Sequence, residues 1–273
     1  MRSRFALTRG VRFVQTNVCG PLHFACLGPH RPAFLDGQFD RIYHVHSRKT
    51  GGTSVNKMFL ALSGTPDVDA LYERLATPPF NVGYGDWRFS GWSARSLRYP
   101  QFDYGFSHVP LNRLALPPRT FRFTILRDPI SRVCSLYDML AGFRDAGSSR
   151  SDVLPQIEWV KDGFAGFLES APQSELSGQL AMFSSGLDAG EALETLAGLE
   201  MVIPLARLDE GLRAMGTRFG VHLRSQHLRK AKHRYEPTLN ELGRLAEILA
   251  EEIAFYEKAL LLADAKYLKH LRR

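Results

Sequence analysis

Cysteine is scarce in this chain, and long apolar runs are absent from it. The three cysteines among 273 residues, Cys19, Cys26 and Cys134, are too few for a disulfide framework. A reducing compartment is the simpler inference, so we expect a soluble, cytoplasmic protein. No run of 18 apolar residues occurs, so no membrane span is expected.

Acidic residues are missing from residues 1–35, where several arginines occur. This composition is typical of an organelle transit peptide, but also of a loose basic arm or of translation from an upstream start codon. No clean apolar segment follows the charges, so a secretory signal is not expected. The Cys-x3-His-x2-Cys-x3-His pattern at 19–30 does not match a common structural zinc site. We therefore expect no metal, a loosely ordered arm at 1–35, and one domain at 36–273.

The chain as a whole is basic, with a formal charge of +7 and a pI of about 9.4. Such a balance favours anionic partners, namely a phosphorylated nucleotide, an acidic glycan or nucleic acid. Basic residues are dense at 222–234. A run of this kind is usually a solvated face, but it could also close over a nucleotide or attract an acidic acceptor.

One stretch, Arg41–Ser54, has the order of a strand, a turn and a helix start. Its first residues are apolar and aromatic, Gly51-Gly52 is a turn signal, and helical spacing follows. A helix N-terminus after glycines binds anions, because its unpaired N–H groups and the helix dipole favour negative charge. Lys49 adds a cation, and Thr53 and Ser54 add hydroxyl donors. The stretch therefore predicts a site for a phosphate or a phosphosulfate.

Two other loop types fit this stretch less well. A Walker P-loop places its lysine after the glycines, whereas Lys49 precedes Gly51. The Lys-Thr-Gly and Ser-x-x-Lys elements of β-lactamases also occur here, but in those enzymes they lie far apart in sequence. A plain strand-to-helix turn with a solvated lysine is the remaining alternative for this stretch on its own.

A second strand-to-helix junction follows a predicted strand at 119–126. Asp128 can cap the next helix, and Pro129 suits its first turn. Arg127 and Ser135 lie off the apolar stripe of that helix, which leaves them available for a ligand. Arginine suits a phosphate dianion because it donates two parallel hydrogen bonds. A local ion pair between Arg127 and Asp128 is the simpler alternative.

The two junctions together resemble the donor-binding motifs of carbohydrate sulfotransferases. His46–Ser54, H-S-R-K-T-G-G-T-S, is similar to their 5′-phosphosulfate loop, H-[IV]-P-K-T-G-G-T-[ST], with Arg48 at the usual proline. Phe123–Tyr137 is similar to their 3′-phosphate element, R-D-P-x-x-R-x-x-S-x-Y. The resemblance covers roughly residues 40–260 and is to a soluble, bacterial-type member of the heparan sulfate 2-O-sulfotransferase kind.

Strand-helix alternation with anion loops after the strands predicts an α/β fold with a mainly parallel sheet. The resemblance narrows this to a P-loop-like three-layer fold, with the central sheet flanked by helices. It implies transfer of a sulfuryl group from 3′-phosphoadenosine 5′-phosphosulfate to a hydroxyl of a glycan, glycolipid or other glycoconjugate. It implies no metal and no nucleic-acid partner.

The resemblance also assigns site residues. Those implied to bind the donor come from both motifs: Arg48, Lys49, Thr50, Gly51, Gly52, Thr53, Ser54, Arg127 and Ser135. Lys49 is in addition catalytic, because it offsets charge on the leaving phosphate. A later segment, Ser177–Gly186, shares Gln179 and Gly186 with a family element, N-x-Q-T-R-x-x-x-G.

The proposed catalytic base is His108, in a strand predicted to begin at 102 and to end at Ser107-His108. The family has a histidine at this place between its two motifs, in a G-H-x-P-like element whose glycine is Ser107 here. A base of ordinary pKa would lose activity as pH falls through about 6.5. His44 and His46 are the competing bases, and Asp86 is the next candidate after them.

The rest of the chain predicts further alternation. Residues 63–100, rich in glycine, proline and aromatics, are expected to form a long excursion with a helix near 67–76. The other predicted elements are helices at 156–169, 175–197, 208–219 and 238–262, and a strand at 201–205.

Two rival functions remain open. One is an ATP-dependent phosphotransferase, against which stand the missing Walker lysine and the lack of a clear magnesium carboxylate. The other is a non-catalytic polyanion-binding protein that uses the positive charge. Preference for adenosine 3′,5′-bisphosphate over AMP would separate the sulfotransferase from the polyanion binder.

Overall fold

The computed structural model describes residues 37–99, 101–223 and 235–271. They form an α/β fold around a six-stranded sheet with the order β2-β3-β4-β1-β5-β6. Only β2 is antiparallel to its neighbour, so the sheet is mainly parallel, as predicted. The strands are β1 (Arg41–Val45), β2 (Asn81–Tyr84), β3 (Trp87–Gly91), β4 (Tyr104–Ser107), β5 (Thr120–Leu126) and β6 (Met201–Pro204).

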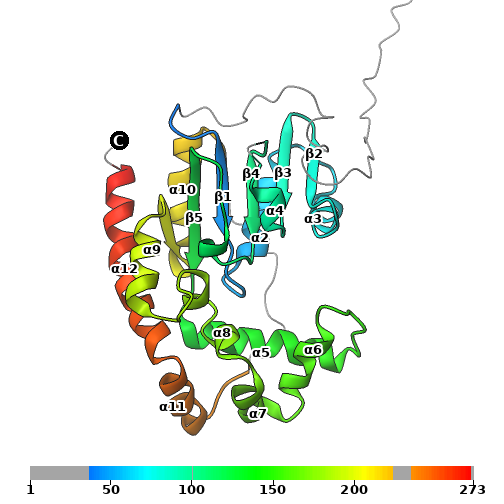
Figure 1. The fold of residues 1–273 in the computed structure, drawn as a ribbon, viewed down its shortest axis with the longest axis vertical. Coiled ribbons are helices and arrows are strands. Elements are labelled where there is room, and N and C mark those ends of the chain that lie inside the picture. The colour runs from blue at the N-terminus through cyan, green and yellow to red at the C-terminus, as the bar shows by residue number, and fades with distance from the viewer. Residues whose placement is uncertain (1–36, 100, 224–234, 272–273) are drawn as a thin grey trace, which may run out of the picture.

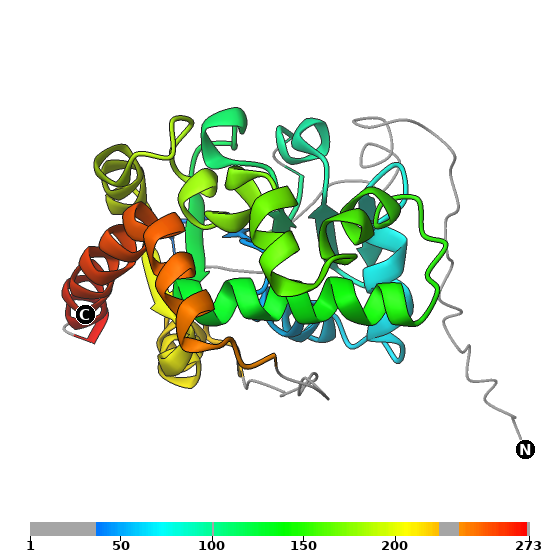
Figure 2. The same ribbon diagram turned by 90° about the horizontal axis from the view of Figure 1, so that it is seen from below.

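The helices are arranged on both faces of the sheet and beyond one of its ends. Helices α5, α7, α8 and α11 gather beyond that end in Figure 1. Figure 2 looks at the same end and shows α5 extending across it. The α-helices are α2 (Gly52–Ala61), α3 (Val68–Leu75), α4 (Ala94–Leu97), α5 (Pro129–Asp145), α6 (Leu154–Ile157), α7 (Gly163–Ser170), α8 (Gln173–Leu176), α9 (Ala189–Ala197), α10 (Leu208–Phe219), α11 (Leu239–Ile248) and α12 (Ala250–Leu271).

Strand β1 shows how the alternation of side chains divides the core. Ile42 packs on one face of the sheet, in a cluster with α2, α3 and α10. Tyr43 and Val45 pack on the other face, with α9 and α12. Successive side chains of a strand point to opposite faces, so a strand buried on both faces needs apolar residues at both parities. A third cluster joins α5, α7 and α11 beyond the end of the sheet.

The parallel strands place their carboxyl ends along one edge. Val45, the last residue of β1, is in register with Ser107 on β4 and with Thr124 on β5. The loops after β1, β4 and β5 therefore leave the sheet side by side, and β5 continues directly into α5. In open α/β sheets this edge forms the ligand crevice.

Several predicted elements differ from the observed ones. Residues 63–100 contain helix α3 as predicted, but also the hairpin of β2 and β3, which extends the sheet. The predicted helices at 156–169 and 175–197 are each broken into short pieces, and the one at 238–262 is two helices, α11 and α12. Apolar spacing continues across these breaks, so the sequence pattern did not reveal them. Residues 1–36, including the predicted basic arm, lie outside the described residues, as does 224–234 of the basic run.

Candidate functional site

The loop after β1 is shaped by two residues in the left-handed backbone region. Lys49 has φ 67° and Gly51 has φ 85°. Gly51 is the N-cap of α2 and offers no side chain, and the first turn of α2 contains no acidic residue. The hydroxyl of Thr50 is buried and donates to the carbonyl of Ser47 at 2.9 Å, so it serves the loop itself. The loop thus ends in an uncapped helix N-terminus, which favours an anion.

Gly52 is required by packing as much as by the turn. A Cβ at this position would lie 2.1 Å from Cδ2 of His46 and 2.8 Å from Cε1 of His44. No side chain fits there, because the His46 ring lies against the backbone of Gly52. The helix can therefore begin close to the carboxyl end of β1 only with glycine at 52.

Thr53 and Ser54 lie in the first turn of α2, as predicted. Both are half-buried, and within the described part of the chain neither hydroxyl has a hydrogen-bond partner. The N–H of Ser54 bonds to the carbonyl of Gly51 at 3.1 Å. The N–H groups of Gly52 and Thr53, the first two residues of α2, have no acceptor within the helix. This N-terminus therefore presents backbone and hydroxyl donors together.

Arg48 makes its contacts with the helices beyond the sheet. Its Nη1 pairs with the carboxylate of Glu175 at 2.8 Å, and its Nη2 donates to Oε1 of Gln156 at 2.8 Å. Arg48 was predicted to bind the donor. The structure instead gives it two protein acceptors, on α6 and α8, so it links the loop to that layer.

Arg127 brings the second motif against the first. It follows β5 directly, and its Nη1 donates to the carbonyl of Lys49 at 3.1 Å. Asp128 caps α5 by accepting from the N–H of Ser131 at 2.7 Å, as the sequence predicted. Ser135 lies further along α5, half-buried, and its hydroxyl has no partner among the residues that the structure describes. The loop of Lys49 and the start of α5 therefore border one site.

His108 follows β4, next to the loop of β1. Its Nδ1 lies 2.5 Å from the carbonyl of His46, which can only accept, so Nδ1 carries the proton. Nε2 of the neutral ring is then the basic nitrogen. Burial lowers the pKa of His108 to about 4; the bond to His46 opposes this shift, and the charge of Arg48 adds to it. The imidazole is therefore uncharged at neutral pH, over a wider range than a histidine of ordinary pKa.

His44 and His46 are enclosed and stacked on each other, with ring centroids 5.0 Å apart. Asn56 joins them: its Oδ1 accepts from Nδ1 of His44 at 2.8 Å, and its Nδ2 donates to Nδ1 of His46 at 3.2 Å. The hydroxyl of Tyr104 also donates to Oδ1 of Asn56, at 2.7 Å. Burial lowers the pKa of His44 to about 3 and that of His46 well below its usual value. These contacts make both histidines packing residues, a weaker choice of base than His108.

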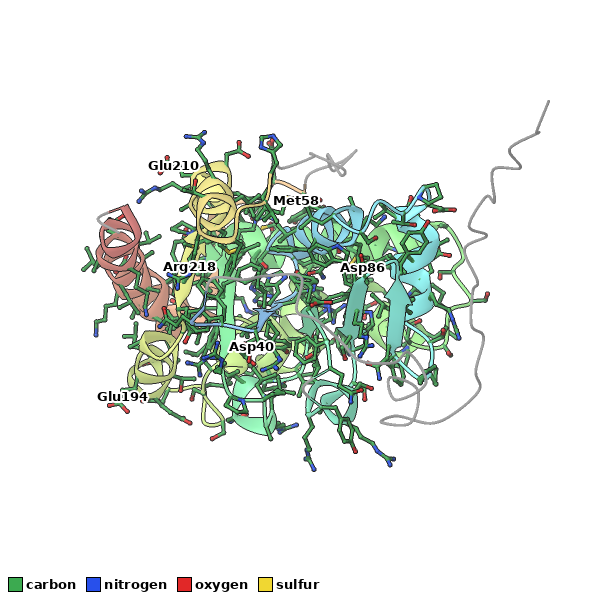
Figure 3. All side chains as sticks on the ribbon, turned by 90° about the horizontal axis from the view of Figure 1, so that it is seen from above. Asp40, Met58, Asp86, Glu194, Glu210 and Arg218 are labelled. Atoms are coloured by element: carbon green, nitrogen blue, oxygen red, sulfur yellow. The ribbon has the colours of Figure 1, made fainter. Side chains whose placement is uncertain are left out.

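Asp86, the reserve candidate for the base, is at the wrong end of the sheet. It lies in the turn between β2 and β3, directly before β3 begins. Since β3 runs parallel to β4, this turn is at the amino edge, opposite the loops of Lys49 and His108. Figure 3 views the sheet from the amino edge and labels Asp86 together with Asp40, which precedes β1.

A buried polar network behind Arg127 was not predicted from the sequence. Arg132 and Glu252 form an ion pair at 3.1 Å, with side-chain exposures of 1% and 0%. Arg132 also donates to the carbonyls of Glu175 and Leu176, which end α8. In the sequence, the one signal for this network was Glu252, a charged residue on an otherwise apolar helix face. Arg132 of the second motif is thus a structural residue.

No cluster of three or more His, Cys, Asp or Glu side chains that could hold a metal ion occurs in the described parts of the chain. Among the helices that the structure describes, none combines the length and the apolar composition needed to cross a membrane.

Comparison with protein-family models found no match for this chain, and comparison with curated proteins found none either.

Proposed function

We propose that this protein transfers a sulfuryl group from 3′-phosphoadenosine 5′-phosphosulfate to a hydroxyl of a carbohydrate or glycoconjugate. The observation that carries the proposal is the contact between Arg127 and the Lys49 carbonyl, 3.1 Å long. It joins two motifs that are far apart in sequence, at the sheet edge where ligands bind in open α/β folds. We also propose that the fold is P-loop-like, since β1 leads into an anion loop from the middle of the sheet.

The residues present fit a donor with two anionic ends. The 5′ end suits the uncapped start of α2, with the donors of Gly52, Thr53 and Ser54. The 3′-phosphate suits Arg127 and Ser135 on the neighbouring element. When bound, the donor supplies a sulfuryl group whose bond to the phosphate oxygen breaks as its bond to the acceptor oxygen forms.

The protein's own residues supply the remaining chemistry. Lys49 and the N–H groups of the α2 start stabilise negative charge on the departing phosphate, without the reorganisation that water would need. His108 accepts the hydroxyl proton of the acceptor at Nε2, and the His46 carbonyl holds its ring through Nδ1. No step requires a metal ion.

Two measurements test the proposal together. Calorimetric titration should show that adenosine 3′,5′-bisphosphate binds far more tightly than AMP. Incubation with donor labelled in its sulfuryl group, and with a panel of glycans, glycolipids and phenols, should transfer the label to a hydroxyl. Equal affinity for the two nucleotides together with no transfer would reject the sulfotransferase in favour of a polyanion binder.

A further inference from the structure

Arg127 is the first residue after β5. Its backbone hydrogen bonds are made by the side chain of Gln179, where a residue within the sheet would bond to a neighbouring strand. Oε1 of Gln179 accepts from the N–H of Arg127 at 2.7 Å, and Nε2 of Gln179 donates to the carbonyl of Arg127 at 2.9 Å. Gln179 is completely buried. One amide therefore fixes both backbone polar groups of the residue proposed to bind the 3′-phosphate.

Gln179 is itself fixed by Glu252 of α12. The carboxylate accepts from Nε2 of Gln179 at 3.1 Å, and from the backbone N–H groups of Gln179 and Leu180 at 3.1 and 3.2 Å. A fourth donor is Nε of Arg132, at 3.1 Å. A buried carboxylate with four donors is well satisfied, and such a network is rigid. The position of the Gln179 amide is therefore set from two sides.

The contacts continue from Arg127 to the donor loop. Its guanidinium donates to the carbonyl of Lys49, whose backbone is in the left-handed region. On the other side of the loop, Arg48 pairs with Glu175, whose carbonyl accepts from Arg132. The network thus contacts the loop at two residues, Lys49 and Arg48. A shift of the Arg127 backbone would move its guanidinium relative to the loop.

We propose that Gln179 is a positioning residue for donor recognition, acting through Arg127 and not through contact with the nucleotide. It holds the Arg127 backbone beyond the end of the sheet. The guanidinium is therefore already in its binding position before the 3′-phosphate arrives. Groups that orient a binding residue lower the cost of ordering it on binding, and their loss weakens the interaction. This inference rests on the proposed function.

The test compares two Gln→Met substitutions in the full chain, one at the buried Gln179 and one at the exposed Gln173. Gln179→Met keeps the shape of the side chain and removes its donor and acceptor. Gln173→Met is the matched control, because Nε2 of Gln173 donates to Oγ of Ser177 and to the carbonyl of Ile248, and touches neither motif. Calorimetry measures the affinity of wild type and both variants for adenosine 3′,5′-bisphosphate and for AMP, and thermal unfolding confirms that each is folded.

Gln179→Met should weaken bisphosphate binding about tenfold. This loss of affinity is at the lower end of the contribution that one charge-assisted hydrogen bond makes to binding. AMP binding should fall by less than about threefold, since AMP lacks the 3′-phosphate that Arg127 recognises. The ratio of the two affinities is the decisive readout, because general damage to the fold would weaken both nucleotides alike. Gln173→Met should leave the ratio unchanged.

A folded Gln179→Met protein with the wild-type ratio would overturn the inference while the proposed function stands. A wild-type protein that does not distinguish the nucleotides would reject both. If Gln179→Met does not fold, Gln179→Asn is decisive in its place. It keeps the amide but shortens the side chain by one methylene, so it should lower the ratio, and an unchanged ratio would overturn the inference.

Discussion

Replacing Lys49 by glycine should separate catalysis from stability, because the two should change in opposite directions. Lys49 has φ 67°, a backbone conformation that costs a residue with a Cβ about 1–2 kcal/mol. Glycine adopts it freely but loses about 0.4–1 kcal/mol through its greater freedom in the unfolded chain. Lys49→Gly should therefore leave the free energy of unfolding unchanged or raise it by up to about 1.5 kcal/mol.

The same change removes the lysine charge from the loop between β1 and α2. Loss of one preorganised charge contact to the transition state typically costs about 10²–10³ in rate. Sulfuryl transfer should fall by this factor, while Tm stays level or rises by about 2–4 °C per kcal/mol gained. Lys49→Ala should lose as much activity without gaining stability, since alanine bears the same backbone strain.

Transfer of the labelled group and calorimetric unfolding are the assays. Lys57→Ala is the matched control: it removes one positive charge from α2, the helix that follows the loop of Lys49, where Lys57 pairs with Asp69, and it should keep most activity. Near wild-type turnover in folded Lys49→Gly would remove Lys49 from the mechanism. A clear fall in Tm would show instead that the lysine side chain holds the loop.

Three further predictions concern residues around the loop. Ser135→Ala should weaken binding of adenosine 3′,5′-bisphosphate roughly tenfold and leave AMP binding unchanged. Arg127→Ala should weaken the bisphosphate more strongly and AMP only slightly, through loss of the bond to the Lys49 carbonyl. Calorimetry would contradict this if either change weakened both nucleotides equally. His108→Gln should lower kcat by about 10²–10⁴. Because burial lowers the pKa of His108 to about 4, its neutral form persists down to that pH. The wild-type rate should therefore stay level from pH 7 to 5 and fall only near pH 4, and a fall centred at about pH 6.5 would refute the buried base. Gly52→Ala should destabilise the protein by about 1–3 kcal/mol, since a methyl group must displace the His46 ring, and an unchanged urea midpoint would contradict that packing.

Acid should also weaken the fold through its buried histidines. The pKa of His44 is lowered to about 3 and that of His108 to about 4, so below about pH 6.5 the unfolded chain takes up protons that the folded chain does not. The free energy of unfolding should fall between about pH 6.5 and 4, by up to about 1.4 kcal/mol per pH unit for each histidine. Urea titrations of wild type and His44→Asn across this range measure the effect. An equal slope in both would show that His44 takes no part in it.

Local signals were enough to predict the parts of the site that depend on backbone geometry. The strand at Arg41–Val45, the helix start after Gly51 and the Asp128 cap all depend on neighbours within a few residues. The order of the elements along the chain was enough to predict the mainly parallel sheet, because alternating strands and helices leave few other arrangements. The end of β4 beside His108 follows in the same way from a short apolar run.

Only the tertiary structure decided which side chains meet across long separations. It paired Arg48 with Glu175, placed Asp86 at the far edge, and joined Gln179 to Arg127 and Glu252. No local pattern encodes these contacts, because each depends on how separate elements pack around the sheet. The lowered pKa of His108 has the same origin, since burial by distant segments sets it. The sequence determined where a glycine turn leads from β1 into a helix, and the packing decided which side chains lie around that turn.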